Sequence, residues 1–351
     1  MMLSLVKKNI YSIKPYRISK EYIHTKLDAN ENPYNLLDIL KEKFIENIDN
    51  LNINRYPDTN SDELRELLAE YVDVKKENIL CGNGSDEIIQ VIINTFVDKD
   101  EYVITHSPTF SMYKIFTNIA GGKILEVLSN SSFQINVDEI IKEAKFKKAK
   151  VIFLCNPNNP TGTVISKEEI ERVIRKTEAI VVVDEAYYEF LGETVVDLVN
   201  VYDNLIVLRT LSKAFALAGA RIGYGIASEK IMDVLYRVKP PYNLSTFSQE
   251  IGKLFIENVD LVKNYIQKIK EERLFLQKEL KKIEYIEVFP TGSNFVLVRS
   301  EKAKRIVEEF KKEGLSIRDF TKEDLLRNCF RITVGTREES NRLLELFKKV
   351  V

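Results

Sequence analysis

Lys213 is the residue of this sequence whose neighbours best suit covalent chemistry. The apolar run over residues 205–208 predicts a buried strand, and Thr210 and Ser212 follow it directly. The Lys213 amine is therefore expected where a sheet opens onto a cleft. Arg221 lies eight residues beyond the lysine, after several small residues that allow backbone to approach a ligand closely. An amine, two hydroxyls and a guanidinium are thus expected on one loop.

This grouping suits pyridoxal phosphate, because the cofactor's aldehyde condenses with a lysine amine while hydroxyl and guanidinium groups hold its phosphate. A nearby cation also helps to keep part of the amine unprotonated. A solvated position on the surface is the commoner role for any one lysine in a chain. The assignment of Lys213 therefore depends on the residues around it.

Two other apolar strands end in polar residues that suit the same ligand. Residues 151–155 lead into a rigid loop with two prolines and a glycine, which contains Asn159. Residues 179–183 end at Asp184, whose carboxylate would be costly to bury without a cation; a protonated pyridine nitrogen would supply one. Tyr187 follows three residues later and could reach the same ring. A helix cap is the alternative role for Asp184.

A phosphate cradle is predicted at residues 84–86. Gly84, Ser85 and Asp86 follow a short strand and open an apolar helix, so unpaired backbone N–H groups are expected there. Turns of this kind often merely cap a helix, which makes the pattern weak by itself. Phe110 follows the next strand and could lie over a planar ring.

The composition of the chain excludes several other classes of protein. Its 351 residues are 44% apolar, and 52 Lys and Arg balance 53 Asp and Glu, which leaves no basic footprint for nucleic acid. Neither a membrane-spanning run nor a signal-peptide core is evident, so a cytoplasmic location is expected. Three widely spaced cysteines indicate buried, reduced thiols, and the two histidines, His24 and His106, argue against triad hydrolysis and metal catalysis.

The order of strand-like and helix-like segments predicts two domains. An N-terminal arm, residues 1–30, precedes a large α/β domain with a mostly parallel sheet, residues 31–240. The segment RVKPPYN, residues 237–243, breaks the pattern and marks the boundary. Residues 241–351 are expected to form a smaller α+β domain that starts with one long amphipathic helix over residues 258–283.

Four motifs in this order resemble pyridoxal-phosphate aminotransferases of the aspartate-aminotransferase fold, most closely the histidinol-phosphate aminotransferase branch. They are DANENPY (28–34), NPNNPTG (156–162), TLSKAFALAGARIGY (210–224) and FRITVGTREES (330–340), so the resemblance covers nearly the whole chain. It implies fold type I of the pyridoxal-phosphate-dependent transferases, with a three-layer α/β/α large domain and a small domain built from both termini. It also implies a homodimer with composite sites.

The resemblance also gives roles to individual residues. Asn159 would donate its amide to the phenolic oxygen of the cofactor, with Tyr187 beside it. Asp184 would pair with the ring nitrogen, Lys213 would bind the aldehyde and move the proton, and Arg221 would hold the phosphate.

Further residues are implied by the resemblance at the substrate side and at the dimer interface. Tyr56, in an RYP motif, would reach the cofactor phosphate of the neighbouring subunit, although packing on its own helix is the commoner role. Arg331 lies in an apolar strand and should meet an anion; an internal salt bridge is the alternative, and Arg318 could supply a second guanidinium. Tyr16 and Asn32 are expected near the substrate entrance.

The implied reaction is a ping-pong transamination of L-histidinol phosphate with 2-oxoglutarate, giving imidazole-acetol phosphate and L-glutamate, a step of histidine biosynthesis. Two related activities stay open: a broad aromatic-amino-acid aminotransferase and a threonine-phosphate decarboxylase. A non-catalytic DNA-binding regulator is disfavoured, because the sequence has neither a basic patch nor an added helix-turn-helix segment.

Overall fold

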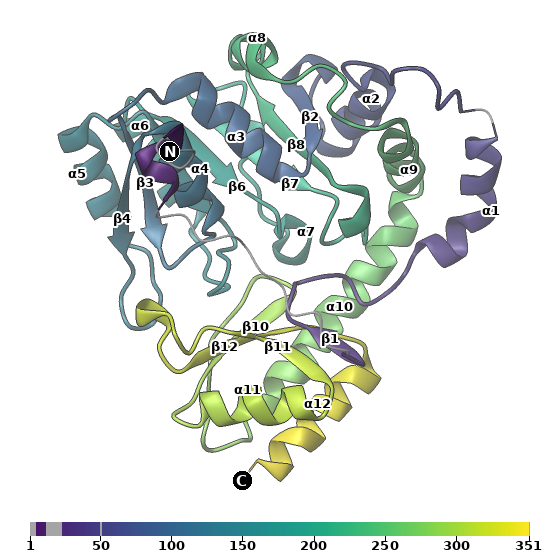
Figure 1. The fold of residues 1–351 in the computed structure, drawn as a ribbon, viewed down its shortest axis with the longest axis vertical. Helices are drawn as coiled ribbons and strands as arrows, with labels where there is room; N and C mark the ends of the chain where they lie inside the picture. The colour runs from purple at the N-terminus through teal and green to yellow at the C-terminus, as the bar shows by residue number, and fades with distance from the viewer. Residues whose placement is uncertain (1–4, 12–22, 50, 351) are drawn as a thin grey trace.

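The computed structural model describes residues 5–11, 23–49 and 51–350. These residues form two sheets, each covered by helices (Figure 1). The larger sheet has the strand order β2-β8-β7-β6-β5-β3-β4, and its strands are β2 (Ile79–Asn83), β3 (Tyr102–Ser107), β4 (Lys123–Leu128), β5 (Val151–Cys155), β6 (Ile180–Asp184), β7 (Leu205–Thr210) and β8 (Ile222–Ala227). Neighbouring strands are parallel except at β8, which runs antiparallel to β2 and β7. The predicted mostly parallel sheet is confirmed.

Helices pack on both faces of the large sheet, and this explains why its strands are apolar throughout. One face carries α3 (Ser85–Phe96), α4 (Met112–Ala120) and α8 (Glu229–Val238), and the other carries α2 (Asp62–Val72), α5 (Val137–Lys147) and α6 (Lys167–Lys176). Along β5, Ile152 and Leu154 are buried on the side of α5 and α6, while Val151, Phe153 and Cys155 are buried on the side of α3 and α8. The large domain therefore has the predicted α/β/α layers.

The smaller sheet joins one strand from the N-terminal part of the chain to four strands from the C-terminal part, as Figure 1 shows. Its order is β1-β11-β12-β10-β9, with strands β1 (Thr25–Leu27), β9 (Glu287–Val288), β10 (Phe295–Arg299), β11 (Leu315–Asp319) and β12 (Cys329–Thr333). Its helices are α10 (Val259–Leu280), α11 (Ala303–Lys312) and α12 (Arg337–Lys349). α12 begins with the expected capping box, in which the Thr336 hydroxyl accepts from the Glu339 N–H and the Glu339 carboxylate accepts from the Thr336 N–H.

The helix that follows the predicted domain boundary packs on the large domain. α9 (Thr246–Glu257) lies against α1 (Leu37–Ile48) and α2, and Gly252 of α9 is so close to Leu64 that an added Cβ would lie 3.1 Å from it. The division after residue 240 stays a prediction, and this packing favours a division within α10. α10 itself is slightly shorter than the predicted helix over 258–283.

The remaining elements of the described residues are short. They are α7 (Tyr188–Leu191) and the 3-10 helices at Lys8–Ile10, Lys76–Asn78, Val196–Leu198, Ala218–Ala220 and Asp324–Leu326. Within the described ranges, no helix has the length and apolar character needed to cross a bilayer.

Candidate active site

The parallel topology brings the predicted polar residues to one edge of the large sheet, because β5, β6 and β7 all end there. They surround a cavity of about 120 Å³, here called the inner cavity. The predicted residues that line it are Ser85, Asp86, Phe110, Asn159, Asp184, Tyr187, Thr210, Ser212, Lys213 and Arg221. Gly84 lies behind Arg221, at the start of α3.

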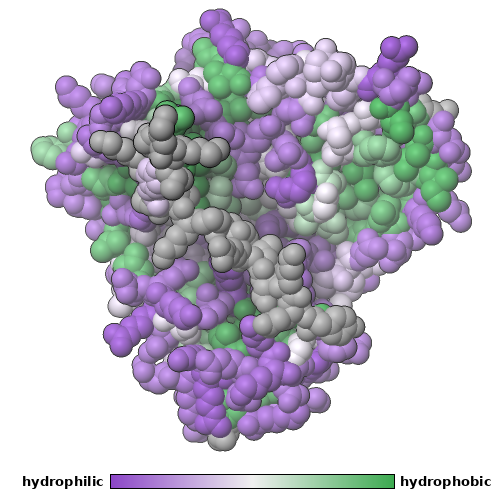
Figure 2. Space-filling view, in the orientation of Figure 1, coloured by the Kyte–Doolittle hydropathy of each residue, from purple (hydrophilic) through white to green (hydrophobic). Residues whose placement is uncertain are grey.

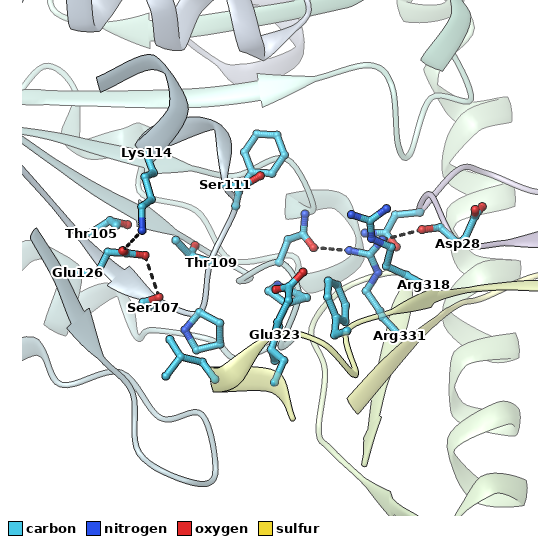
Figure 3. Close-up of a pocket in the computed structure, with 18 of the residues that line it drawn as sticks. Asp28, Thr105, Ser107, Thr109, Ser111, Lys114, Glu126, Arg318, Glu323 and Arg331 are labelled. Carbon is cyan, nitrogen blue, oxygen red and sulfur yellow. Dashed lines mark hydrogen bonds and ion pairs between the residues drawn. The ribbon is translucent and has the colours of Figure 1, made fainter. Parts of the chain in front are cut away.

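A second, larger cavity adjoins the first and is here called the outer cavity (Figure 3). It measures about 450 Å³ and lies between the large and the small domain. Phe110, Asn159, Tyr187 and Lys213 line both cavities. Lys213 therefore stands where a ligand in the inner cavity would meet a ligand in the outer one.

The Lys213 amine is fixed by a hydrogen bond and has a lowered pKa, both of which favour its action as a nucleophile. Its Nζ donates to the Ala29 carbonyl at 3.1 Å. Burial lowers the pKa of Lys213 from its usual range to about 8, and the guanidinium groups of Arg331 and Arg221 add to this effect. A substantial fraction of the amine is thus neutral near pH 8, as attack on an aldehyde requires.

Asp184 is a buried carboxylate without a cation at ion-pair distance among the described residues. It is 3% exposed, and it accepts hydrogen bonds from the Tyr113 hydroxyl at 2.6 Å and from the Ala186 N–H at 3.1 Å. Burial raises the pKa of Asp184 to about 6, although the Tyr113 hydrogen bond opposes this. A positively charged N–H donor in the inner cavity would offset the cost of burying this charge, and a protonated pyridine nitrogen fits that need.

Another group of residues that line the inner cavity is suited to an anion. Gly84 precedes α3 with φ 78°, and a Cβ there would lie 2.3 Å from the guanidinium of Arg221, so only glycine fits this turn. Arg221 donates to the Ser212 hydroxyl at 3.4 Å and lies 3.5 Å from Asp86. The unpaired N–H groups of the α3 N-terminus, a guanidinium and a hydroxyl together match a phosphate group.

Asn159 and Tyr187 are each held by a residue from the small domain or the N-terminal arm. The Asn159 side-chain oxygen accepts from the guanidinium of Arg331, which also donates to the Asp28 carbonyl at 2.8 Å. The Tyr187 hydroxyl accepts from the Asn30 amide at 2.8 Å. These contacts fix both side chains at the border of the two cavities.

Comparison with known proteins identifies the family. A family model described as "Aminotransferase class I and II" matches residues 22–347. The chain belongs to this aminotransferase family. The histidinol-phosphate aminotransferase of Clostridium novyi (strain NT) is 41% identical over 348 residues, which cover 99% of this chain and 98% of that protein. The protein of the same name from Thermoanaerobacter sp. (strain X514) is 42% identical over 351 residues and covers both chains completely.

A solved structure resembles the aminotransferase at the level of the fold and of the sequence. The crystal structure of the histidinol-phosphate aminotransferase from Clostridium acetobutylicum superposes with a TM-score of 0.84 at 27% identity, and it covers 93% of this chain and 98% of that chain. The two-domain architecture described above is therefore shared by both proteins.

Two predicted site residues of the aminotransferase, Asn32 and Tyr56, line neither cavity of their own chain. The Asn32 amide donates to the Ala214 carbonyl at 3.0 Å, so this side chain holds the loop after Lys213 and lines neither cavity. The contact of Asn32 with substrate stays a prediction, and the structure shows Asn32 bound to the backbone of the loop instead. Tyr56 is 80% exposed and stacks on Tyr242 at 4.5 Å. Tyr16 lies outside the described residues.

Thr210 lines the inner cavity, but its hydroxyl forms hydrogen bonds with the protein backbone. Its Oγ1 donates to the Ile222 carbonyl at 3.2 Å and accepts from the Ser212 N–H at 3.1 Å. Thr210 therefore shapes the turn that carries Ser212 and Lys213.

Several residues of the site were missed in the sequence. Tyr113, which binds Asp184, lies three residues after Phe110, and Asn30, which binds Tyr187, lies inside the DANENPY motif. At the far end of the outer cavity, Lys114 pairs with Glu126 at 2.5 Å, and the Ser107 hydroxyl donates to the same carboxylate at 3.1 Å (Figure 3). An aromatic residue in an amphipathic helix is usually a core residue, so no local pattern distinguished Tyr113.

Proposed function

We propose that this aminotransferase binds pyridoxal phosphate in the inner cavity and transfers the amino group of L-histidinol phosphate to 2-oxoglutarate, giving imidazole-acetol phosphate and L-glutamate. The observation that carries the proposal is the position of Lys213, whose amine lies between a cavity suited to the cofactor and a cavity lined by Arg331 and Arg318. The names of relatives about 41% identical over nearly the whole chain support the choice of substrates.

The residues of the inner cavity divide the work of holding the cofactor. Asp184 pairs with the ring nitrogen and keeps it protonated, and Asn159 and Tyr187 bind the phenolic oxygen. Ser85, Ser212, Arg221 and the N-terminus of α3 hold the phosphate, and Phe110 covers the ring. When bound, pyridoxal phosphate supplies an electron sink that acidifies the hydrogen on the substrate α-carbon.

Lys213 moves the proton of the reaction. With cofactor and substrate bound, the Lys213 amine would take the proton from the substrate α-carbon as a general base and return it to the cofactor as a general acid. The lowered pKa of Lys213, about 8, lets the free amine act as a base near neutral pH. The position of Lys213 and its lowered pKa therefore both favour the transfer of this proton.

The outer cavity accepts both substrates through their anionic groups. Arg331 and Arg318 occupy paired positions on β12 and β11, and both line the outer cavity (Figure 3). Histidinol phosphate has no carboxylate, so its phosphate takes the place that the α-carboxylate of glutamate takes in the other half-reaction. One pair of guanidinium groups thus serves two kinds of anion.

The test of this function is a comparison of amino donors with purified enzyme and 2-oxoglutarate. We expect kcat/KM for histidinol phosphate to exceed that for phenylalanine at least about 100-fold, because a charge-assisted contact to the phosphate is absent with phenylalanine. Preference for phenylalanine would indicate the aromatic aminotransferase. Release of carbon dioxide from O-phosphothreonine would instead indicate the decarboxylase.

The aminotransferase is further proposed to act as a homodimer in which Tyr56 completes the site of the partner. Hydrophobic residues gather around α1 and α9 on the face drawn in Figure 2. The exposed large apolar side chains of these helices are Ile39, Ile45 and Phe247, and Tyr56 and Tyr242 are also exposed. Exposed apolar patches of this kind are typical of interfaces between subunits. Tyr56 is 80% exposed and lines neither the inner nor the outer cavity of its own chain, which leaves its side chain accessible to a second subunit.

Mixed dimers test this arrangement. Lys213→Ala subunits and Tyr56→Phe subunits, each poorly active alone, should regain about a quarter of wild-type activity when mixed at equal amounts. Half of the dimers are then hybrids, and each hybrid has one intact site if Tyr56 acts across the interface. Activity no higher than the sum of the two separate variants would show that Tyr56 acts within its own chain or not at all.

A further inference from the structure

Tyr113 of α4 is fully buried beneath the inner cavity, and it touches the carboxylate that the proposed function places on the cofactor. Its hydroxyl donates to Asp184 Oδ2 at 2.6 Å. Its ring stacks on Phe153 of β5 with centroids 4.5 Å apart and an interplanar angle of 7°, and Phe110 meets it edge-on at 5.6 Å. Packing on both sides therefore fixes the direction in which the hydroxyl points.

The Tyr113 hydroxyl is constrained to act as a donor. Burial and the negative charge of Asp184 raise the pKa of Tyr113 well above its usual range, so the phenol keeps its proton. An ionised carboxylate only accepts hydrogen bonds, so the phenolic hydrogen must lie on the line to Asp184. The second oxygen, Oδ1, accepts from the Ala186 N–H at 3.1 Å. Two donors from different elements thus hold the carboxylate.

The other groups that face Asp184 do not offer it a positive charge. Cys155 is its register partner on β5, and burial raises the pKa of this thiol to about 12, so the thiol is neutral. Asp86 on α3 and the adjacent Glu185 raise the pKa of Asp184, and the Glu185 charge is largely taken up by Arg209 at 2.8 Å. Tyr113 is therefore the side chain that opposes neutralisation of Asp184.

We propose that Tyr113 is a positioning residue, whose hydroxyl holds the Asp184 carboxylate in the orientation and charge state that pair with a protonated pyridine nitrogen. The inference rests on the proposed binding of pyridoxal phosphate and extends it to a residue outside the cavity lining. Tyr113 lines neither cavity, so its hydroxyl acts on the cofactor through Asp184, while its ring packs against Phe110.

A merely structural tyrosine is the competing explanation, since a buried aromatic ring also stabilises the core. Tyr236 on α8 provides a matched control. It packs against the same core as Tyr113, and its hydroxyl donates to the Ile79 carbonyl at 2.9 Å, away from both cavities. Tyr113→Phe and Tyr236→Phe each remove one hydrogen-bonded hydroxyl and keep the ring.

The experiment measures the Kd of pyridoxal phosphate for the apoenzyme by absorbance or fluorescence titration, which needs no turnover. We expect Tyr113→Phe to weaken binding about 10-fold, as the loss of one hydrogen bond to a charged group predicts, and Tyr236→Phe to change it less than about twofold. In an Asp184→Asn background, the effect of Tyr113→Phe should fall below about twofold, because no charge remains for the hydroxyl to hold.

The outcomes separate the inference from the proposed function. Equal Kd values for wild type and Tyr113→Phe, or an undiminished effect in the Asp184→Asn background, would overturn the role of Tyr113 while leaving the cofactor assignment intact. Failure of the wild-type apoenzyme to bind pyridoxal phosphate would overturn both. If Tyr113→Phe does not fold, Tyr113→His keeps an N–H donor in a smaller ring. It should then bind the cofactor within about threefold of wild type, whereas Tyr113→Leu should not.

Discussion

Lys213→Ala is expected to abolish transamination, with kcat lowered at least about 10⁴-fold, because the substitution removes both the covalent attachment of the cofactor and the base that moves the proton. One residue serves both steps, so the two losses cannot be added as independent effects. The measurement is single-turnover conversion of histidinol phosphate by purified enzyme loaded with pyridoxal phosphate.

Lys239→Ala is the matched control for this substitution. Lys239 is also buried, its pKa is lowered chiefly by burial, and its Nζ donates to the Thr59 and Pro240 carbonyls at 3.0 Å, but it lines neither cavity. Its kcat should stay within about threefold of wild type, since it touches no reacting group. If the absorption band of lysine-bound pyridoxal phosphate survived in Lys213→Ala, the assignment of this lysine would be wrong.

Arg331→Gln is expected to lower kcat/KM at least about 100-fold for both histidinol phosphate and glutamate, because each substrate loses a charge-assisted contact to the same guanidinium. Gln keeps a hydrogen-bond donor near Asn159 but carries no charge. The measurement is the rate of each half-reaction, followed separately with one substrate at a time. An unchanged KM for the phosphorylated substrate would contradict the proposed role.

Arg331→Gln should also change the titration of Lys213, and this readout does not depend on substrate. Arg331 is one of the cations that lower the pKa of Lys213 to about 8, so its removal should raise that pKa. Capture of pyridoxal phosphate by the apoenzyme should speed up with rising pH, with a midpoint near 8 in wild type and a higher midpoint in the variant. Arg337→Gln, which breaks an exposed pair with Glu272, should leave the midpoint unchanged.

The residues that sequence reasoning placed at the cavities are those that follow apolar strands. Asp184 is the last residue of β6, and Asn159 and Lys213 lie in the loops that follow β5 and β7. These parallel strands end at one edge of the sheet. For such residues the local sequence pattern is enough to predict their position, because the parallel topology brings the strand ends together.

Residues whose position depends on pairing between distant segments were harder to predict. Asn30 and Asn32 lie two positions apart in one motif, yet Asn30 meets Tyr187 and Asn32 turns to the Ala214 backbone. Asn30 has φ 55°, and this left-handed residue redirects the chain just after β1. Tyr113 was missed because its value to the site comes from Asp184, which is 71 residues away in sequence.

β1 pairs with β11 and so fixes the position of the three residues that follow it, which limits how far the N-terminus can be shortened without loss of activity. The three residues after β1 contact different parts of the site: the Asp28 carbonyl accepts from Arg331, the Ala29 carbonyl from Lys213, and Asn30 donates to Tyr187. A truncated form that starts after residue 30 would retain every side chain assigned to the cofactor. Lys213, Arg331 and Tyr187 would, however, lose the two backbone carbonyls and the Asn30 amide that orient them. Limited proteolysis within this stretch should therefore inactivate the enzyme while leaving the large sheet folded.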